Sequence, residues 1–364
     1  MGGAEYQTHL LAEELARRPN VQVCYLARRV PEAAAAADLS YSVRGIGNAT
    51  GIRRRAVFFD ADGLSRALAE IRPDVIYQQM KQSYSAVCAA YARRAGIPFF
   101  LHIASEWDLD PSWMPLRLSL NTPFDVVEAI TGNWGLRRAT HIVVQTESQG
   151  QKLRDRFKKE AALLVRTFQP LPSELIDKPP GKRHVVWVGN LKEVKRRELF
   201  LDLAESLVDR GDFRFHMVGR PWMHRRAAPL MERIAGLKNL DYHGELPQAR
   251  VNSLISSSSF FVNTSAHEGF PNTFIQAWAN GAVLLSLVVD PYDGMEGLGI
   301  GFLTGTLERM KDRLLELANQ PARRDAVAAR AFEFVHGNHS PAEGERLADA
   351  IIASTRAGVF ARSG

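Results

Sequence analysis

A glutamate and a carboxamide lie eight residues apart in the stretch SSFFVNTSAHEGFPNTFIQAWANG, residues 258–281. Glu268 falls in a loop after the apolar run 259–263, and Gln276 falls about one turn into the helix predicted next. A carboxylate accepts hydrogen bonds from sugar hydroxyls, whereas a carboxamide both donates and accepts them. Because side chains one turn apart share a helix face, both residues can face one ligand. The spacing predicts a site for a polar ligand.

The ends of that helix are marked in the sequence. Pro271 and Asn272 favour a helix start, through a fixed φ and a capping side chain, and Gly281 favours a stop. Gly269 permits close approach of the backbone to a ligand. The free N–H groups at the helix start would attract an anion such as phosphate.

A second candidate segment is VVWVGNLKEVKRRELF, residues 185–200. An apolar run ends at Gly189, and the cations Lys192, Lys195, Arg196 and Arg197 follow within a few residues. Cations beside a strand end stabilise a diphosphate and the charge that develops as it leaves. Taken alone, Lys195 also fits a solvated lysine at the start of a helix.

Short apolar runs alternate with amphipathic stretches along most of the chain, which predicts parallel sheets covered by helices on both faces. In such sheets, ligands bind beyond the carboxyl ends of the strands. The Pro-rich segment FQPLPSELIDKPPGKRH, residues 168–184, reads as an interdomain linker. We therefore expect domains at 1–170 and 184–340, a linker at 171–183, and a last helix in 341–364 that packs back on the first domain.

The chain opens on MGGAEYQTHLLAEEL, a Gly-Gly turn followed directly by a helical pattern. In a doubly wound domain such a turn normally follows a strand, and that strand is usually central. We expect that the first strand of this domain is missing; the alternative is a domain that begins with a helix.

Both halves resemble family-four retaining glycosyltransferases of the GT-B type. The matching segments in the second half are WVGNLKEVKR, FHMVGRP, YHGELPQARVNSLISSSSFFVNTS, HEGFPNTFIQAWANG and GIGF. Those in the first half are GGAEYQTHLLAEEL, RPDVIYQQ, GIPFFLHIASEWD and ATHIVVQTESQGQKLRDRF. The resemblance implies an α/β fold of two doubly wound, Rossmann-like domains facing a cleft. It also implies transfer of a sugar from a nucleotide-diphosphate sugar to an acceptor hydroxyl.

The resemblance suggests roles for residues of the second half. Lys195 resembles the lysine that grips the donor diphosphate, and Glu268 resembles the first of two paired glutamates, which approaches the donor sugar. Gln276 occupies the place of the second glutamate, which holds ribose hydroxyls; the substitution keeps a hydrogen-bond acceptor but loses the charge, which bears on donor affinity more than on the reaction class. The remaining donor-site candidates are Asn190, Arg196, Arg220, Leu246, Gly269, Phe270, Pro271, Asn272 and Thr273.

In the first half, Gly2 and Gly3 resemble the glycine turn that lets acceptor and phosphates approach the backbone. His102 matches a family histidine near the donor sugar, although a structural role is an open alternative. The resemblance implies no cofactor beyond the donor substrate.

Other classes of enzyme find less support. Asp60-x-Asp62 and Asp108-x-Asp110 have the spacing of a metal-binding carboxylate pair, but we read both as loop or cap carboxylates and expect no metal. The patterns of Ser-His-Asp hydrolases, HExxH zinc enzymes and P-loop proteins are absent, as is the glycine spacing of NAD-binding domains. A nucleotide-sugar epimerase and a non-catalytic nucleotide-sugar binder remain as alternatives.

Composition limits the expected cellular location and the partners of the protein. No apolar run approaches the ~20 residues of a membrane span, no signal peptide is visible, and Cys24 and Cys88 suggest neither a disulfide framework nor a zinc site. The formal net charge of +6 is carried by scattered Arg residues, which disfavours nucleic acid as a partner. We expect a cytoplasmic enzyme of surface glycan biosynthesis with a glycan or lipid-linked acceptor. Loop 111–124 could contact an anionic membrane, although packing within the domain explains most of its apolar residues.

Overall fold

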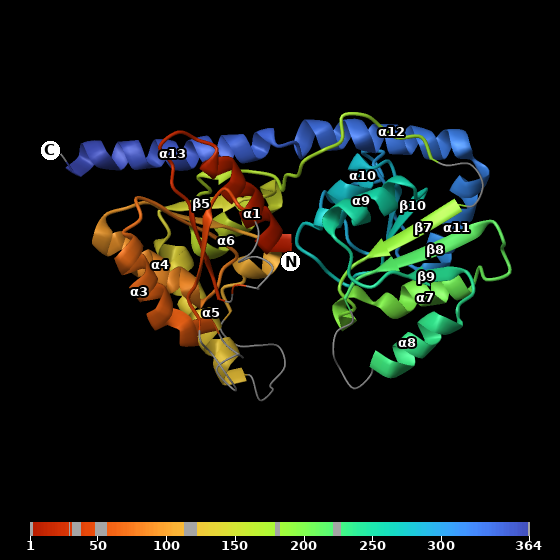
Figure 1. Cartoon of the computed structure of the whole chain (residues 1–364), viewed down its shortest axis with the longest axis horizontal. Coiled ribbons are helices and arrows are strands. Elements are labelled where there is room, and N and C mark those ends of the chain that lie inside the picture. Colours follow the sequence, from red (N-terminus) through yellow and green to blue (C-terminus); the bar gives the residue numbers. More distant parts are fainter. Residues whose placement is uncertain are drawn as a thin grey trace. The chain divides into compact units, whose positions relative to one another are not determined.

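The computed structural model describes residues 3–28, 30, 38–47, 57–112, 122–178, 183–220 and 227–362. The chain divides into two compact units (Figure 1), the first formed by residues 1–169 with 341–364 and the second by residues 170–340. The predicted linker, 171–183, is thus grouped with the second unit. Among the described residues, no helix combines the length and the hydropathy needed to cross a bilayer.

Parallel strands and helices alternate in the first unit. The order of its elements is α1 (Gly3–Ala16), β1 (Cys24–Ala27), β2 (Ser42–Gly45), the 3-10 turn η2 (Val57–Asp60), α3 (Ala61–Ile71), β3 (Ile76–Gln79), α4 (Ser83–Ala95), β4 (Phe99–His102), the 3-10 turn η3 (Glu106–Leu109), α5 (Thr122–Arg138), β5 (His141–Val144), α6 (Glu147–Phe157), β6 (Leu163–Leu164) and α13 (Ala342–Arg362).

The described strands of this unit form two sheets. One has the order β3-β4-β5-β6, the other pairs β1 with β2, and both are parallel. No described strand pairs with both sheets. Successive residues of β4 enter different cores, as the alternation of a strand requires: Phe99 and Leu101 pack with α3, α4 and α6, whereas Phe100 packs with Leu11 of α1 and Leu347 of α13.

The second unit contains one larger sheet. Its elements are β7 (Arg183–Val188), the 3-10 turn η4 (Glu193–Lys195), α7 (Arg197–Glu205), β8 (Phe213–Val218), α8 (Ala227–Gly236), β9 (Leu240–Tyr242), α9 (Gln248–Ser256), β10 (Phe260–Asn263), α10 (Asn272–Ala279), β11 (Val283–Ser286), β12 (Phe302–Leu303), α11 (Leu307–Asn319) and α12 (Pro321–Asn338). The strand order is β12-β11-β10-β7-β8-β9, and every pair is parallel.

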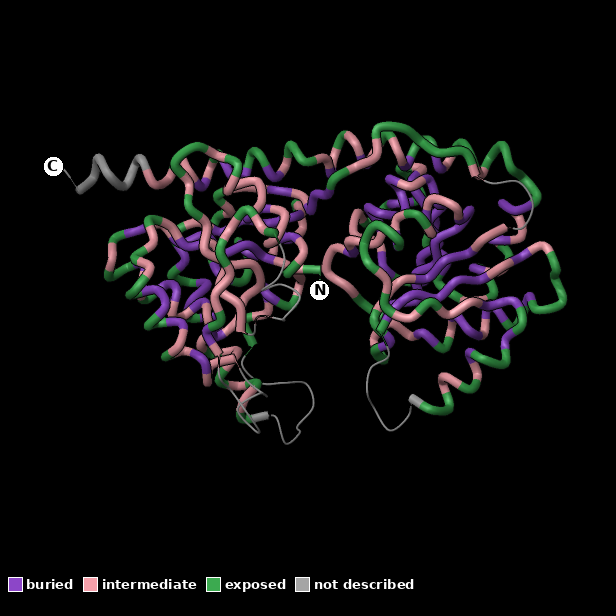
Figure 2. The backbone as a smooth tube through the Cα atoms, in the orientation of Figure 1, coloured by how far each residue is buried: buried purple, intermediate pink, exposed green. Residues whose placement is uncertain are grey.

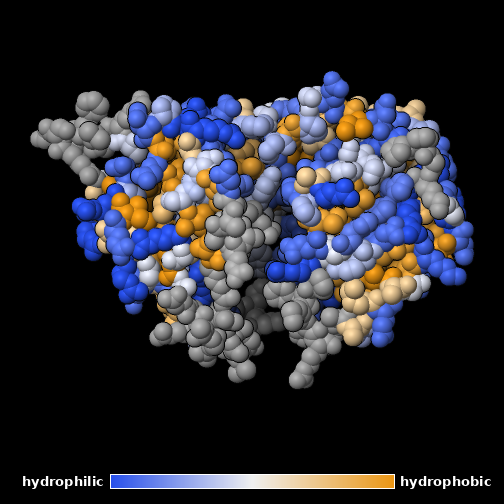
Figure 3. Space-filling model, in the orientation of Figure 1, coloured by the Kyte–Doolittle hydropathy of each residue, from blue (hydrophilic) through white to orange (hydrophobic). Residues whose placement is uncertain are grey.

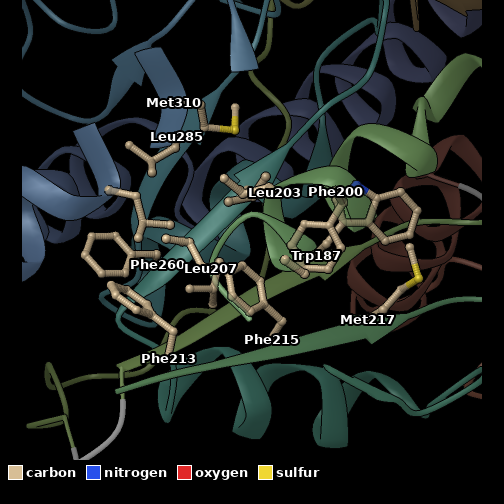
Figure 4. Packing of buried hydrophobic residues seen from close by; sticks show 14 of the residues in the cluster. Trp187, Phe200, Leu203, Leu207, Phe213, Phe215, Met217, Phe260, Leu285 and Met310 are labelled. Carbon is tan, nitrogen blue, oxygen red and sulfur yellow. The ribbon is translucent and has the colours of Figure 1, made fainter. Parts of the chain in front are cut away.

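Both faces of this sheet are covered. On one face, Trp187 of β7 and Phe215 of β8 pack with Phe200 of α7 (Figure 4). On the other face, Phe261 of β10 packs with Trp278 of α10 and residues of α9 and α12. The buried positions follow the strands of each unit (Figure 2). The visible surface of each unit mixes polar with apolar residues (Figure 3).

The strand order of this sheet changes direction between β7 and β10. The chain runs from β7 outward through β8 and β9, then returns to β10 on the other side of β7 and continues outward through β11 and β12. In open parallel sheets, a ligand crevice forms outside the carboxyl ends of the strands at such a switch point. The loops that follow β7 and β10 are therefore the first place to look for a site.

Candidate active site

An ion pair joins the two loops at the switch point. Lys195, at the end of η4, donates from Nζ to Oε2 of Glu268 at 2.7 Å. The side chains of Lys195 and Glu268 keep 24% and 13% of their exposure, so both are accessible from solvent. The loop after β7 supplies the cation and the loop after β10 supplies the carboxylate. The structure thus brings together two residues that lie far apart in the sequence.

Two further side chains fix the other oxygen of this carboxylate. Oε1 of Glu268 accepts hydrogen bonds from Nδ2 of Asn263 at 2.8 Å and from Oγ of Ser265 at 2.6 Å. Asn263 ends β10 and Ser265 follows it closely, so the rigid sheet anchors both donors. With three donors around it, the carboxylate is held in one orientation.

Thr264 connects the same loop to the backbone beneath Lys195. Its Oγ1 donates to the carbonyl of Lys195 at 2.7 Å and accepts from Nε1 of Trp187 at 3.0 Å. The amide of Ala266 also donates to the carbonyl of Val194 at 2.8 Å. These bonds close the loops onto each other, so the separation of Lys195 and Glu268 is set by the backbone as well as by the side chains.

Arg196 binds the loop that follows β10. It adopts the left-handed conformation, with φ of 44°, between η4 and α7. Its guanidinium donates from Nε to the carbonyl of Thr264 at 2.8 Å and from Nη2 to the carbonyl of Ser265 at 2.9 Å. These contacts support a positioning role for Arg196, whereas the sequence suggested direct substrate binding.

The predicted helix after Glu268 is present as α10. It begins at Asn272 after Pro271 and is followed by Gly281 in the left-handed conformation, with φ of 66°. The N–H groups of Gly269 and Thr273 donate to no acceptor in the described part of the chain. They are therefore available to an anion or a hydroxyl at this helix start.

Gln276 lies one turn into α10 and is buried, at 6% exposure. Its side-chain amide makes no hydrogen bond to any described residue. Its amide atoms are not among the fully buried unpartnered atoms of the described residues, so they remain accessible to water or to a ligand. Phe270 has a different environment, because its ring packs edge-on against Tyr292 and also contacts Trp278, which supports a packing role.

The remaining candidates of the second unit follow strand ends. Asn190 is exposed after β7, Arg220 is exposed after β8, and Leu246 is half-buried after β9. The strand ends approach closely there: a Cβ on Gly219 would lie 1.9 Å from the carbonyl oxygen of Gly189. These residues border the edge of the sheet that carries the Lys195–Glu268 pair.

The first unit holds the other candidates. His102 ends β4 and is buried, at 3% exposure, with Nδ1 2.7 Å from the hydroxyl of Tyr77. Burial lowers the pKa of His102 to about 3, so the ring is neutral. These features support the structural alternative.

Gly3 is the first residue of α1, whereas Gly2 and most of loop 111–124 lie outside the described residues.

One aspartate of each pair is used inside the fold. Asp60 pairs with Arg28 and accepts from the hydroxyl of Tyr84. Asp108 accepts the backbone N–H groups of Ala104 and Ser105. The described residues contain no group of three or more potential metal ligands.

Sequence reasoning missed the roles of Trp187, Asn263, Thr264 and Ser265. The available signal was the run of polar residues NTS directly after the apolar strand FFV. Which of these side chains would reach Glu268 and which would reach Lys195 depends on the tertiary structure.

The sequence matches two family models that together span most of the chain. The model described as "Glycosyl transferase 4-like domain" matches residues 2–166, and the model described as "Glycosyl transferases group 1" matches residues 182–320. The chain belongs to family four of the glycosyltransferases. Family membership makes it a glycosyltransferase of the GT-B type, with two Rossmann-like domains. No curated protein matches the sequence of this glycosyltransferase.

Solved structures show the same fold. HepE from Anabaena, in complex with UDP-glucose, is 15% identical, with a TM-score of 0.73 over 97% of this chain and 96% of the other. Sucrose-phosphate synthase from Thermosynechococcus elongatus is 15% identical, with a TM-score of 0.74 over 100% and 93%. WaaG, a glycosyltransferase involved in lipopolysaccharide biosynthesis, is 16% identical, with a TM-score of 0.72 over 96% of each chain.

Proposed function

We propose that this glycosyltransferase moves a hexosyl group from a nucleotide-diphosphate sugar to an acceptor hydroxyl, with retention of configuration at the anomeric carbon. The observation that carries the proposal is the Lys195–Glu268 pair at the switch point, beside the start of α10. The complex of the similar protein HepE with UDP-glucose supports an activated saccharide as the donor.

The leaving diphosphate requires positive charge and hydrogen-bond donors. Lys195 supplies the charge, and the N–H groups of Gly269 and Thr273 supply donors that need no reorganisation. Because these groups can neutralise the diphosphate, we propose a reaction that requires no metal ion and no cofactor. Glu268, oriented by Asn263 and Ser265, accepts hydrogen bonds from hydroxyls of the donor sugar.

Retention follows in this proposal from attack on the face that the diphosphate leaves. The transition state resembles an oxocarbenium ion paired with the departing diphosphate. The acceptor oxygen forms the new bond to the anomeric carbon while the bond to the diphosphate oxygen breaks. That diphosphate oxygen takes the acceptor proton, so no enzymic base is required. The first unit binds the acceptor, which is a glycan or lipid-linked hydroxyl of a surface glycan or polysaccharide.

Donor turnover with and without acceptor tests the proposal. The protein is screened against nucleotide sugars by thermal shift, because a ligand of the native state raises Tm. The donor that binds is then incubated with sugar acceptors, and the anomeric configuration of the product is read by NMR. We expect acceptor-dependent turnover with retention, unchanged by a chelator.

Other results identify the alternatives. Isomerisation of the donor without acceptor would indicate an epimerase. Donor binding without any turnover would indicate a non-catalytic binder, which the uncharged Gln276 mildly favours. An inverted product, or strong inhibition by the chelator, would contradict the proposed mechanism.

A further inference from the structure

Three large apolar side chains of helix α5 in the first unit face solvent. Val127, Ile130 and Trp134 are 36%, 52% and 37% exposed. They recur at intervals of three and four residues, so they lie along one side of the helix. A surface helix of a globular protein normally turns such a stripe inward. We call these three residues the α5 stripe.

The opposite side of α5 is packed through small residues. A Cβ on Gly135 would lie 2.3 Å from the backbone carbon of Ser85 in α4, and one on Gly132 would lie 3.2 Å from Cγ of Lys81. Leu136 is fully buried on the same side. The glycines let α5 approach α4 closely, so the orientation of α5 is fixed by packing. The α5 stripe is therefore held outward by the fold.

Positive charge lies at the end of the stripe. Arg137 and Arg138 are exposed in the last turn of α5, and the guanidinium of Arg138 stacks 4.0 Å from the ring centroid of Trp134. Neither arginine forms a salt bridge within the described part of the chain. Asp125, also exposed on α5, is offset by two residues from Val127 and so lies on another side of the helix.

More cations adjoin this end of the helix. Lys159 donates to the carbonyl of Ala139, directly after α5, at 2.9 Å, and Lys158 beside it is exposed. An outward apolar stripe that ends in unpaired cations matches the chemistry of an anionic lipid surface. The apolar side chains enter the acyl boundary, and the cations remain among the phosphates.

We propose that α5 is the contact of this protein with an anionic phospholipid membrane. Trp134 suits the interface, because its ring is amphipathic and Arg138 stacks on it. The α5 stripe enters the outer part of the leaflet while Arg137 and Arg138 contact lipid phosphates. This inference does not depend on the proposed transfer reaction.

Vesicle flotation of the full-length protein tests this inference. The vesicles contain phosphatidylcholine alone or phosphatidylcholine mixed with phosphatidylglycerol. We expect binding to the mixed vesicles that weakens as salt increases. The double variant Ile130→Ser/Trp134→Ser should lower the partition coefficient by about tenfold or more, because it removes most of the apolar area. Arg137→Gln/Arg138→Gln should lower it by about fivefold per charge on anionic vesicles.

The matched control is Ile176→Ser/Val208→Ser, which removes two exposed apolar side chains from the second unit. It should bind vesicles like the unmodified protein. Circular dichroism and Tm should be unchanged in all three double variants, because every altered side chain is at the surface.

Two results would overturn the inference. One is equal vesicle binding by the stripe variant and the control. The other is a dimer in light scattering that the stripe variant alone dissociates, since a second copy of the chain would then cover the stripe.

Discussion

Nζ of Lys195 lies 2.7 Å from Oε2 of Glu268, although 73 positions separate the two residues in the sequence. Each residue comes from a loop that follows one of two adjacent central strands, β7 and β10. The pair is anchored from both sides: Thr264 binds the carbonyl of Lys195, and Asn263 and Ser265 bind the carboxylate of Glu268. This geometry makes the pair the first target for mutation.

Replacing either partner should impair transfer. In the proposed reaction, Lys195→Ala removes the cation that neutralises the diphosphate, and Glu268→Ala removes the acceptor for sugar hydroxyls. We expect each variant to lower kcat/KM by at least about tenfold, which corresponds to about 1.4 kcal/mol of transition-state stabilisation. Steady-state kinetics with donor and acceptor measure the effect. Near-normal turnover in both variants would contradict the site assignment.

Gln276 allows a gain of donor binding to be tested. Introducing a carboxylate in Gln276→Glu should tighten donor binding by several fold, because hydrogen bonds to a charged acceptor are about twice as strong as neutral ones. Gln276→Leu, of similar size, should weaken it. Isothermal titration with the donor measures both. If the Glu and Leu variants bind the donor equally well, Gln276 lies outside the donor site.

Arg196 is expected to act through the loop that it holds. Arg196→Met breaks its bonds to the carbonyls of Thr264 and Ser265, which should destabilise the second unit by about 1–3 kcal/mol. Transfer should fall because Glu268 is less well positioned, and Arg196→Lys should restore only part of it. Urea unfolding and kinetics are measured together. A loss of activity without any loss of stability would instead indicate direct substrate contact.

Gly219 tests how closely the strand ends must approach. It has φ of 152°, and a Cβ there would lie 1.9 Å from the carbonyl oxygen of Gly189. Gly219→Ala should therefore lower the free energy of unfolding by about 3 kcal/mol or more. Gly211→Ala is the matched control, because nothing lies within 4 Å of its Cβ position. Equal Tm values for the two variants would refute this explanation.

The burial of His102 predicts that the folded protein loses stability in acid. Its folded pKa, lowered by burial to about 3, lies below that of the unfolded chain, so the unfolded state binds more protons between pH 6.5 and 3. The free energy of unfolding should fall as the pH falls through this window, by up to about 1.4 kcal/mol per pH unit from this residue. His102→Gln should lack that component. Urea unfolding of both proteins at several pH values measures it.

The activity of the same variant separates two roles for His102. A structural histidine predicts loss of stability with transfer retained at neutral pH. Abolished transfer in a stably folded His102→Gln protein would support contact with the donor sugar.

The order of strands and helices and the segments that carry the candidate site could be predicted from local sequence patterns. The alternation of apolar runs and amphipathic stretches predicted parallel sheets between helices, because strand and helix periods differ. Pro271, Asn272 and Gly281 predicted the bounds of α10 closely, because capping and left-handed φ are local properties. The cations after Gly189 and the loop around Glu268 could be identified as candidate parts of a ligand site from residue type and position.

The contacts that these residues make could not be predicted, because they depend on how distant segments pack. The strand order places β7 beside β10, and that adjacency brings Lys195 to Glu268. The loop that follows β10 also receives the guanidinium of Arg196. In the first unit, packing buries His102 against Tyr77 and turns the α5 stripe outward. These outcomes depend on contacts between segments far apart in the chain. Local propensity carries no information about which distant segment will be the neighbour.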